Sequence, residues 1–135
     1  MKLTVKNVCK VFENREDRTQ RIHALKDVSF SVEGGEFCAI VGESGSGKST
    51  LAQIISGLIS TCSGEVLLDT ISITPRSRQK NQAVSADIQL VLQDGKSALD
   101  PHFTVYKCIA EPLRNLCHMS KVEEAARVSE LLDQM

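Results

Sequence analysis

The sequence predicts an α/β fold in which an apolar strand leads through a glycine-rich turn into a helix. Residues 37–41 (Phe-Cys-Ala-Ile-Val) are apolar at every position, which is typical of a central parallel strand covered on both faces. Residues 42–50 follow as Gly-Glu-Ser-Gly-Ser-Gly-Lys-Ser-Thr. After this turn, apolar residues recur with the spacing of one helical face, at Leu51, Ile54, Ile55 and Leu58. Strand, turn and helix in this order indicate a sheet with a helix packed against it.

Two further strands are expected before residue 37. Residues 2–12 alternate between polar and apolar with one slip, as a partly exposed strand with a bulge does. Residues 13–21 carry charges of both signs and are expected to form a solvated loop. Residues 24–32 have apolar side chains mostly at even spacing, which predicts a second strand. Residues 33–36 (Glu-Gly-Gly-Glu) form the turn that follows it.

Two more strands and a long connection are expected after the helix. Residues 65–69 predict one strand, and residues 87–92 predict another that ends in the polar loop 93–103. Between them, residues 70–86 contain no acidic side chain and carry a small basic run at Arg76, Arg78 and Lys80. Because the chain as a whole is not basic, we interpret this run as a solvated connection.

The last third of the chain predicts two helices. Thr104 is expected to cap a helix whose apolar positions are Val105, Cys108, Ile109, Pro112, Leu113 and Leu116. Pro112 removes a backbone hydrogen bond, so this helix is expected to kink or restart there. Ser120 and Glu123 match a capping box. The final helix carries apolar residues at Val122, Ala125, Val128 and Leu132.

The glycine-rich turn has the composition of a phosphate-binding loop, G-x-x-x-x-G-K-[ST]. Gly42, Gly45 and Gly47 let the backbone turn sharply and bring its N–H groups toward an anion. The helix that begins near Gly47 or Lys48 adds unpaired N–H groups and a partial positive charge. Lys48 supplies a charge for the outer phosphates, and the Ser49 hydroxyl is a hard ligand suited to Mg²⁺. The alternative is a glycine turn that only precedes a core helix.

Composition limits the classes of function. The chain has 135 residues, enough for one domain core, with 41% hydrophobic and 24% charged residues and a net charge of −1. These values exclude a disordered chain and a general nucleic-acid binder. No segment approaches the ~20 apolar residues of a membrane span, and the N-terminus lacks the apolar stretch of a signal peptide. A cytosolic protein is therefore expected.

Several motifs together resemble the nucleotide-binding subunit of ABC transporters. Phe12 ends a strand, and the segments 42–52, 63–66 and 88–94 follow in the order of that subunit's N-terminal half. The segments 97–101, 104–105 and 110–113 look most like the ATPases of dipeptide, oligopeptide and nickel importers. The resemblance implies a P-loop NTPase fold of ABC type. It comprises an N-terminal β-subdomain, part of the parallel core sheet and the start of the helical subdomain.

The same resemblance divides the chain, 1–135, into the parts of an incomplete nucleotide-binding domain. These are N-terminal strands in 1–36, the P-loop strand and helix in 37–60, strands and a connection in 61–92, the Q-loop in 93–104 and the start of the helical subdomain in 105–135.

By this resemblance the chain binds ATP and Mg²⁺. Phe12 would stack on adenine, and packing in the core is the competing interpretation of that residue. Gln93 would be the Q-loop glutamine, which reaches Mg²⁺ or the attacking water. Lys48 and Gln93 are therefore the catalytic candidates, and Ser49 and Gln93 the metal-binding ones. The expected nucleotide contacts are Phe12, Gly42, Glu43, Ser44, Gly45, Ser46, Gly47, Lys48, Ser49 and Thr50. The sequence departs from the family at Gly95, where proline is usual, and at Thr70, where glycine is usual.

A second alignment places residues 97–100 in the D-loop that follows the Walker B acids. It would require Asp-Glu at positions 93 and 94, which are Gln-Asp, and a preceding signature sequence, which is absent. The Q-loop alignment is therefore better. Residues 66–69 are the other apolar run that ends in an aspartate, but they follow the P-loop too closely for Walker B.

The resemblance also implies partners and a location. Two such subunits sandwich ATP and drive a membrane permease, so we expect a peripheral protein on the cytoplasmic face of the membrane that has no membrane span of its own and binds no nucleic acid. The 135 residues contain no Leu-Ser-Gly-Gly-Gln signature, Asp-Glu strand end or switch histidine. We therefore expect ATP binding with poor hydrolysis from this chain alone. The alternatives are a truncated, non-hydrolysing module with a regulatory or vestigial role, and another P-loop enzyme such as a small-molecule kinase.

Overall fold

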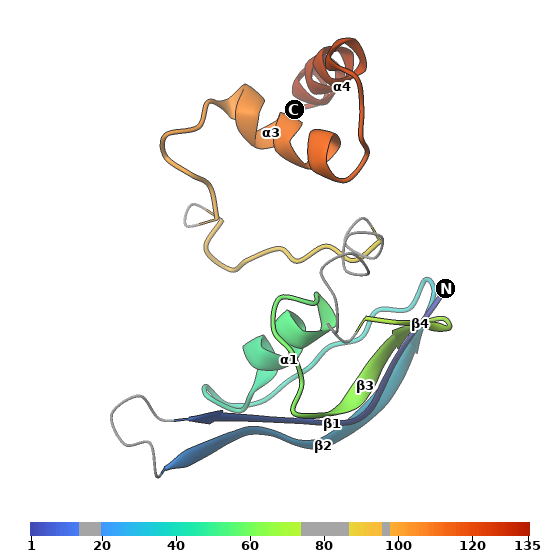
Figure 1. The fold of residues 1–135 in the computed structure, drawn as a ribbon, viewed down its shortest axis with the longest axis vertical. Coiled ribbons are helices and arrows are strands. Elements are labelled where there is room, and N and C mark those ends of the chain that lie inside the picture. The colour runs from blue at the N-terminus through green and yellow to red at the C-terminus, as the bar shows by residue number, and fades with distance from the viewer. Residues whose placement is uncertain (14–19, 74–86, 96–97) are drawn as a thin grey trace. The chain divides into compact units, whose positions relative to one another are not determined.

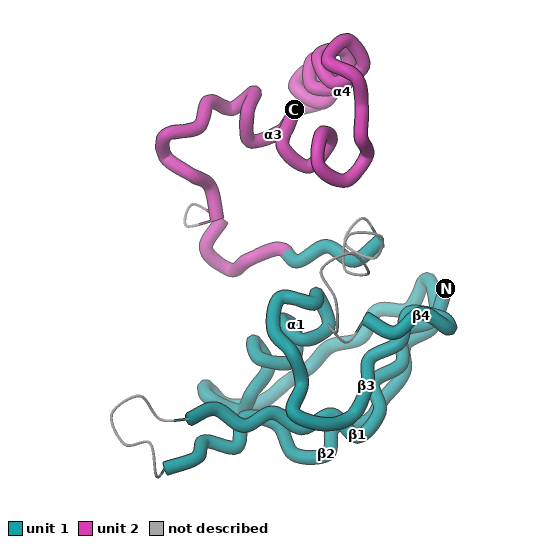
Figure 2. Tube along the Cα trace, in the orientation of Figure 1, with its two compact units in different colours: residues 1–90 teal, residues 91–135 magenta. Residues whose placement is uncertain are grey.

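In the residues that it describes, the computed structural model of the chain has an antiparallel sheet with one helix on its face and, later in the sequence, a pair of helices (Figure 1). The structure describes residues 1–13, 20–73, 87–95 and 98–135. Its elements are β1 (Lys2–Glu13), β2 (Arg21–Glu33), α1 (Lys48–Ile55), β3 (Ser63–Leu68), β4 (Ile71–Ser72), α3 (Val105–Asn115) and α4 (Lys121–Asp133). The chain divides into a first unit, residues 1–90, and a second unit, residues 91–135 (Figure 2).

The sheet has the order β2-β1-β3-β4, with every pairing antiparallel. The bulge expected in the first strand is confirmed, because the register of β1 against β2 shifts between Val5 and Val8 and again on both sides of Lys10. At the first shift Asn7 has a φ of 47°, and its side-chain amide donates to the Asp27 carboxylate at 2.7 Å. Bulges of this kind bend a strand and redirect its side chains.

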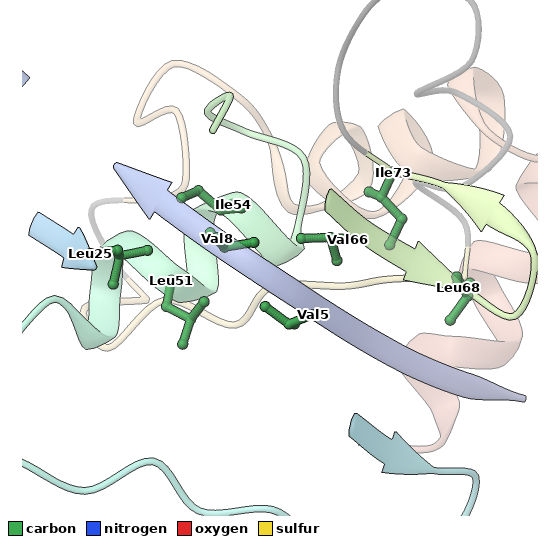
Figure 3. Packing of buried hydrophobic residues seen from close by; sticks show 8 residues of the cluster. All are labelled: Val5, Val8, Leu25, Leu51, Ile54, Val66, Leu68 and Ile73. Carbon is green, nitrogen blue, oxygen red and sulfur yellow. The ribbon is translucent and has the colours of Figure 1, made fainter. Parts of the chain in front are cut away.

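Helix α1 covers one face of this sheet and closes the core of the first unit. Leu51 and Ile54 are 4% and 2% exposed and pack with buried residues of β1, β2 and β3. Figure 3 shows this cluster, which comprises Val5, Val8, Leu25, Leu51, Ile54, Val66, Leu68 and Ile73. The expected apolar stripe is wrong at Leu58, which is 65% exposed because the helix ends at Ile55.

The parallel strand predicted at residues 37–41 is not formed among the described residues. This segment has no strand assignment, Val41 is 90% exposed and Cys38 is exposed. A strand exists only through hydrogen bonds to a neighbour, and none of the four described strands pairs with these residues. The described residues of this chain therefore form no parallel sheet, although the apolar run leads into the glycine turn as expected.

The strand predicted at residues 87–92 is likewise absent. The described residues there are irregular, with Val91 92% exposed, although Ile88 packs against the core cluster of the first unit. The short strand β4 falls in the expected connection after residue 69 and was not predicted. The basic run at Arg76, Arg78 and Lys80 lies outside the described residues, as does most of the expected loop 13–21.

In the second unit, both predicted helix starts are confirmed. The Thr104 hydroxyl accepts a hydrogen bond from the Lys107 N–H at 3.3 Å. Ser120 and Glu123 form both bonds of a capping box, which satisfies N–H groups that a helix start leaves unpaired. Helix α3 continues through Pro112 as one element, so of the expected kink or restart, the restart does not occur.

Helices α3 and α4 are joined by a polar network around a buried carboxylate. Glu124 is 3% exposed, and it accepts two hydrogen bonds from Arg114, at 2.7 and 2.9 Å, and one from the Tyr106 hydroxyl at 3.1 Å. The bonds from Arg114 hold the pKa of Glu124 below its ordinary value. Val128 is buried as the predicted apolar face requires, but Val122 is 80% and Leu132 44% exposed, so the predicted face is wrong at these two positions.

Among the described residues, no helix combines the length and the apolar character that crossing a bilayer requires.

Candidate phosphate-binding site

The glycine-rich loop between residue 41 and α1 is folded around the side chain of Lys48. The Lys48 ammonium donates to the carbonyl oxygens of Gly42 and Glu43, at 2.8 and 2.6 Å, and lies 3.3 Å from the Ser46 hydroxyl. The Ser46 N–H donates back to the Glu43 carbonyl at 3.2 Å. The loop therefore curls around a positive charge, and that charge can attract an anion.

Two glycines make this curl possible. Gly45 and Gly47 have φ angles of 80° and 95°, in the region that residues with a Cβ avoid. At Gly47 a Cβ would also lie 2.4 Å from the Ala24 carbonyl oxygen of β2 and 2.9 Å from the Leu25 side chain. The loop thus sits directly on the backbone of β2, and only glycine fits at its last position.

Helix α1 opens toward the loop without a capping side chain. Its N-cap is Gly47, which makes no side-chain hydrogen bond to the first turn. The Leu51 N–H donates to the Gly47 carbonyl at 2.9 Å. Because a helix leaves its first N–H groups without internal partners, those of α1 can serve an anion.

The remaining predicted loop residues surround this helix start. Glu43 and Ser44 are exposed in the turn, Ser49 is exposed in the first turn of α1, and Thr50 is half-buried behind it. The residues fit a phosphate chain with its metal for two reasons. The Ser49 side chain is exposed and directly follows the loop. Glycine at position 42 leaves free the space beside the Ser46 hydroxyl that a Cβ, 2.8 Å from it, would fill. Bound Mg²⁺ would neutralise phosphate charge, and Ser49 is the residue that would hold it.

Phe12, the predicted base-stacking residue, lies at the end of β1 and is 38% exposed. It is not a core residue, which removes the competing interpretation. The Lys10 ammonium stands over its ring, 5.1 Å from the centroid. Sequence reasoning did not single out Lys10, although a residue two positions earlier on a strand lies on the same face.

Gln93, the other catalytic candidate, belongs to the second unit and is exposed. It follows the irregular segment 87–92 and precedes residues 96–97, which lie outside the described part of the chain. Its role at the nucleotide stays a prediction.

Asp69, the aspartate that ends the apolar run 66–69, has a structural role. Its carboxylate accepts a hydrogen bond from the Lys2 N–H at 2.6 Å, and its own N–H donates to the Lys2 carbonyl at 2.7 Å. These bonds tie the end of β3 to the start of β1. The sequence argument against a Walker B role for this residue therefore agrees with its position.

An apolar cavity of about 360 Å³ in the first unit contains none of the predicted phosphate-binding residues. It is lined by Met1, Leu3, Phe30, Val32, Glu33, Gly34, Cys38, Ile40, Ile55 and Leu68. Such a lining offers little to a charged ligand, so the glycine loop remains the candidate site.

Comparison with known proteins identifies the family. A family model described as ABC transporter matches residues 25–135. The chain belongs to the ABC transporter family. Within it, the nickel import ATP-binding protein NikE of Shigella flexneri is 36% identical, over 96% of this chain and 50% of that protein. The NikE of Escherichia coli strain K12 is 40% identical over 80% of this chain and 40% of its own length.

Solved structures agree on the fold. The ATP-binding cassette MJ0796, described as a dimer in a post-hydrolysis state bound to ADP and Pi, superposes with a TM-score of 0.81 at 34% identity. The match covers 97% of this chain and 56% of that one. A second dimeric structure of MJ0796 gives a TM-score of 0.79 at 33% identity. The fold predicted from the sequence, an α/β nucleotide-binding domain of ABC type, is therefore confirmed, and the chain spans about half the length of the relatives it matches.

Proposed function

We propose that this chain is the ATP-binding portion of an ABC importer ATPase, with Mg²⁺ as the accompanying metal. The observation that carries the proposal is the glycine loop folded around the Lys48 ammonium at the uncapped start of α1. The start of a helix and a cation therefore lie in the same loop, a combination that favours a ligand with several anionic oxygens. A nucleoside triphosphate with Mg²⁺ has that chemistry.

The contacts of Lys48 indicate how the phosphates bind. An ammonium has three donors, and two of them are satisfied by the short bonds to the Gly42 and Glu43 carbonyls. The third contact, to the Ser46 hydroxyl, is longer at 3.3 Å. We expect a phosphate oxygen to replace this contact, while the carbonyls keep the ammonium directed at the mouth of the loop.

The proposed assignments beyond the loop rest on family likeness. Phe12 stacks on the base, Gln93 acts at Mg²⁺ or the attacking water, and residues 105–135 begin the helical subdomain. The cargo of the importer is nickel, the substrate in the printed names of the NikE relatives, with peptides as the alternative that residues 97–101 suggest. A permease in the membrane and a second ATPase subunit are the proposed partners, and the protein acts at the cytoplasmic face.

Calorimetric titration with ATP and with inorganic tripolyphosphate, both with Mg²⁺, tests this function. Lys48→Ala removes charge-assisted bonds worth roughly 1.5 to 3 kcal/mol, so both ligands should bind about tenfold to a hundredfold more weakly. Lys6→Met is the matched control, because the Lys6 ammonium is 3.5 Å from Glu65 on the sheet. Unchanged affinity of Lys48→Ala for both ligands would show that the loop is only a turn before a core helix.

A phosphate-release assay separates the two candidate activities of this site. Mg²⁺-dependent hydrolysis that Lys48→Ala abolishes supports an ATPase subunit. Because poor hydrolysis is expected from these 135 residues alone, the assay is made on a full-length version of the subunit. Tight ATP binding without turnover there supports the non-hydrolysing module instead, since binding needs only the cradle whereas hydrolysis also needs a group that orients the attacking water.

A further inference from the structure

Lys10 makes two contacts that join the end of β1 to the segment after α1. Its ammonium donates to the Ser60 carbonyl at 2.6 Å and lies 5.1 Å from the centroid of the Phe12 ring. A cation within about 6 Å of an aromatic face is attracted by the ring. Lys10 therefore holds one face of Phe12 while it is itself anchored on the segment between α1 and β3.

That anchoring segment is fixed to the helix of the phosphate site. The N–H groups of Leu58 and Ile59 both donate to the Gln53 carbonyl of α1, at 2.9 and 3.3 Å. On its other side, the Cys62 N–H donates to the Cys9 carbonyl of β1 at 2.9 Å. Thus a short series of hydrogen bonds runs from the helix that begins at Lys48 to the strand end that carries Phe12.

We propose that Lys10 is a positioning residue for the nucleotide base: it fixes the Phe12 ring so that the face opposite the ammonium receives the purine. Phe12 keeps 38% of its surface exposed, so part of this residue is accessible to a planar partner. A ring held in one orientation loses less conformational freedom when the base stacks on it. The inference rests on the proposed nucleotide site and adds to it the residue that orients the base platform.

Titration with two ligands tests Lys10 separately from the phosphate cradle. Lys10→Met keeps the aliphatic stem and removes the charge, so ATP should bind about threefold to tenfold more weakly, and tripolyphosphate should bind as before. Lys10→Arg should restore ATP affinity, because a guanidinium also stands over aromatic rings. In a Phe12→Leu background, Lys10→Met should cause no additional loss.

The outcomes distinguish this inference from the proposed function. An equal loss of ATP and tripolyphosphate binding in Lys10→Met, or a loss that persists in the Phe12→Leu background, would mean that Lys10 only stabilises the fold. Unchanged ATP affinity in Lys10→Met together with the expected loss in Lys48→Ala would overturn the role of Lys10 and leave the cradle intact. If Lys48→Ala changes nothing, the nucleotide site itself fails.

An NMR measurement on the unsubstituted chain tests the inference even if the substituted variants do not fold. In the unsubstituted chain, ATP should shift the NMR resonances of the Phe12 ring and of the Lys10 ε-methylene, which lies in the ring's magnetic field. Tripolyphosphate should leave both unchanged. Equal shifts with the two ligands would contradict a base stacked on this ring.

Discussion

Replacing Gly47 by alanine should unfold the loop that the phosphate site depends on, and Gly45 provides a matched control. Both residues have positive φ, 95° and 80°, so alanine at either one introduces left-handed strain of about 1 to 2 kcal/mol. Only at Gly47 does the new Cβ meet other atoms, 2.4 Å from the Ala24 carbonyl and 2.9 Å from the Leu25 side chain. At Gly45 no atom lies within 4 Å.

The difference between the two variants isolates the steric effect. The Ala24 carbonyl belongs to β2, whose pairing with β1 resists displacement, and overpacking of this kind costs about 1 to 3 kcal/mol. We therefore expect Gly47→Ala to lower the free energy of unfolding by about 2 to 5 kcal/mol in total, and Gly45→Ala by about 1 to 2 kcal/mol.

Equilibrium unfolding in urea, followed by far-ultraviolet circular dichroism, measures this difference. Hydrogen exchange of the β1 and β3 amides reports on the first unit alone. ATP affinity should fall in Gly47→Ala, because this residue joins the loop to α1. Equal midpoints of unfolding for the two variants would refute the close approach of the loop to β2.

Three further predictions concern other parts of the chain. Because the folded-state pKa of Glu124 lies below its ordinary 4.5, its contribution to stability is present above pH 4.5 and is lost as the pH falls through the lower folded value. Thermal melts from pH 3 to 6 should show this loss, and Arg114→Met should weaken it. If Gln93 acts at Mg²⁺ or water, Gln93→Ala in a full-length version of the subunit should lower ATP turnover more than ATP affinity, and an equal fall in both would indicate a structural role. Phe37 and Val41 expose an apolar row, so the 135-residue chain should self-associate. Sedimentation velocity should show smaller species for Phe37→Lys with Val41→Lys, and a monodisperse unsubstituted chain would contradict the prediction.

The sequence predicted correctly those features of the structure that depend on neighbouring residues. The glycine turn, the start of α1 and the caps at Thr104 and Ser120 each depend on a few consecutive residues, and all are found. A cap is a hydrogen bond between residues three apart, and a glycine turn is a property of single φ angles. Nothing distant is needed to specify either one.

The buried face of α4 was not predictable in the same way. Val122 and Val128 both fit an apolar stripe, yet Val122 is 80% exposed and the charged Glu124 is buried. The reason lies on α3, where Arg114 and Tyr106 meet the carboxylate. A buried charge is tolerated only when it has such partners, and periodicity within one helix contains no information about them.

By itself, the sequence determined the family, the phosphate-binding loop and the places where helices begin, because each of these depends on a motif or on neighbouring residues. Only the tertiary structure decided that residues 37–41 pair with none of the described strands, that Gly47 rests on the Ala24 carbonyl and that Lys10 links Phe12 to Ser60. Strand pairing and side-chain contacts join residues far apart in the chain. The preference of a residue for a strand or a helix gives no indication of which distant group will be beside it.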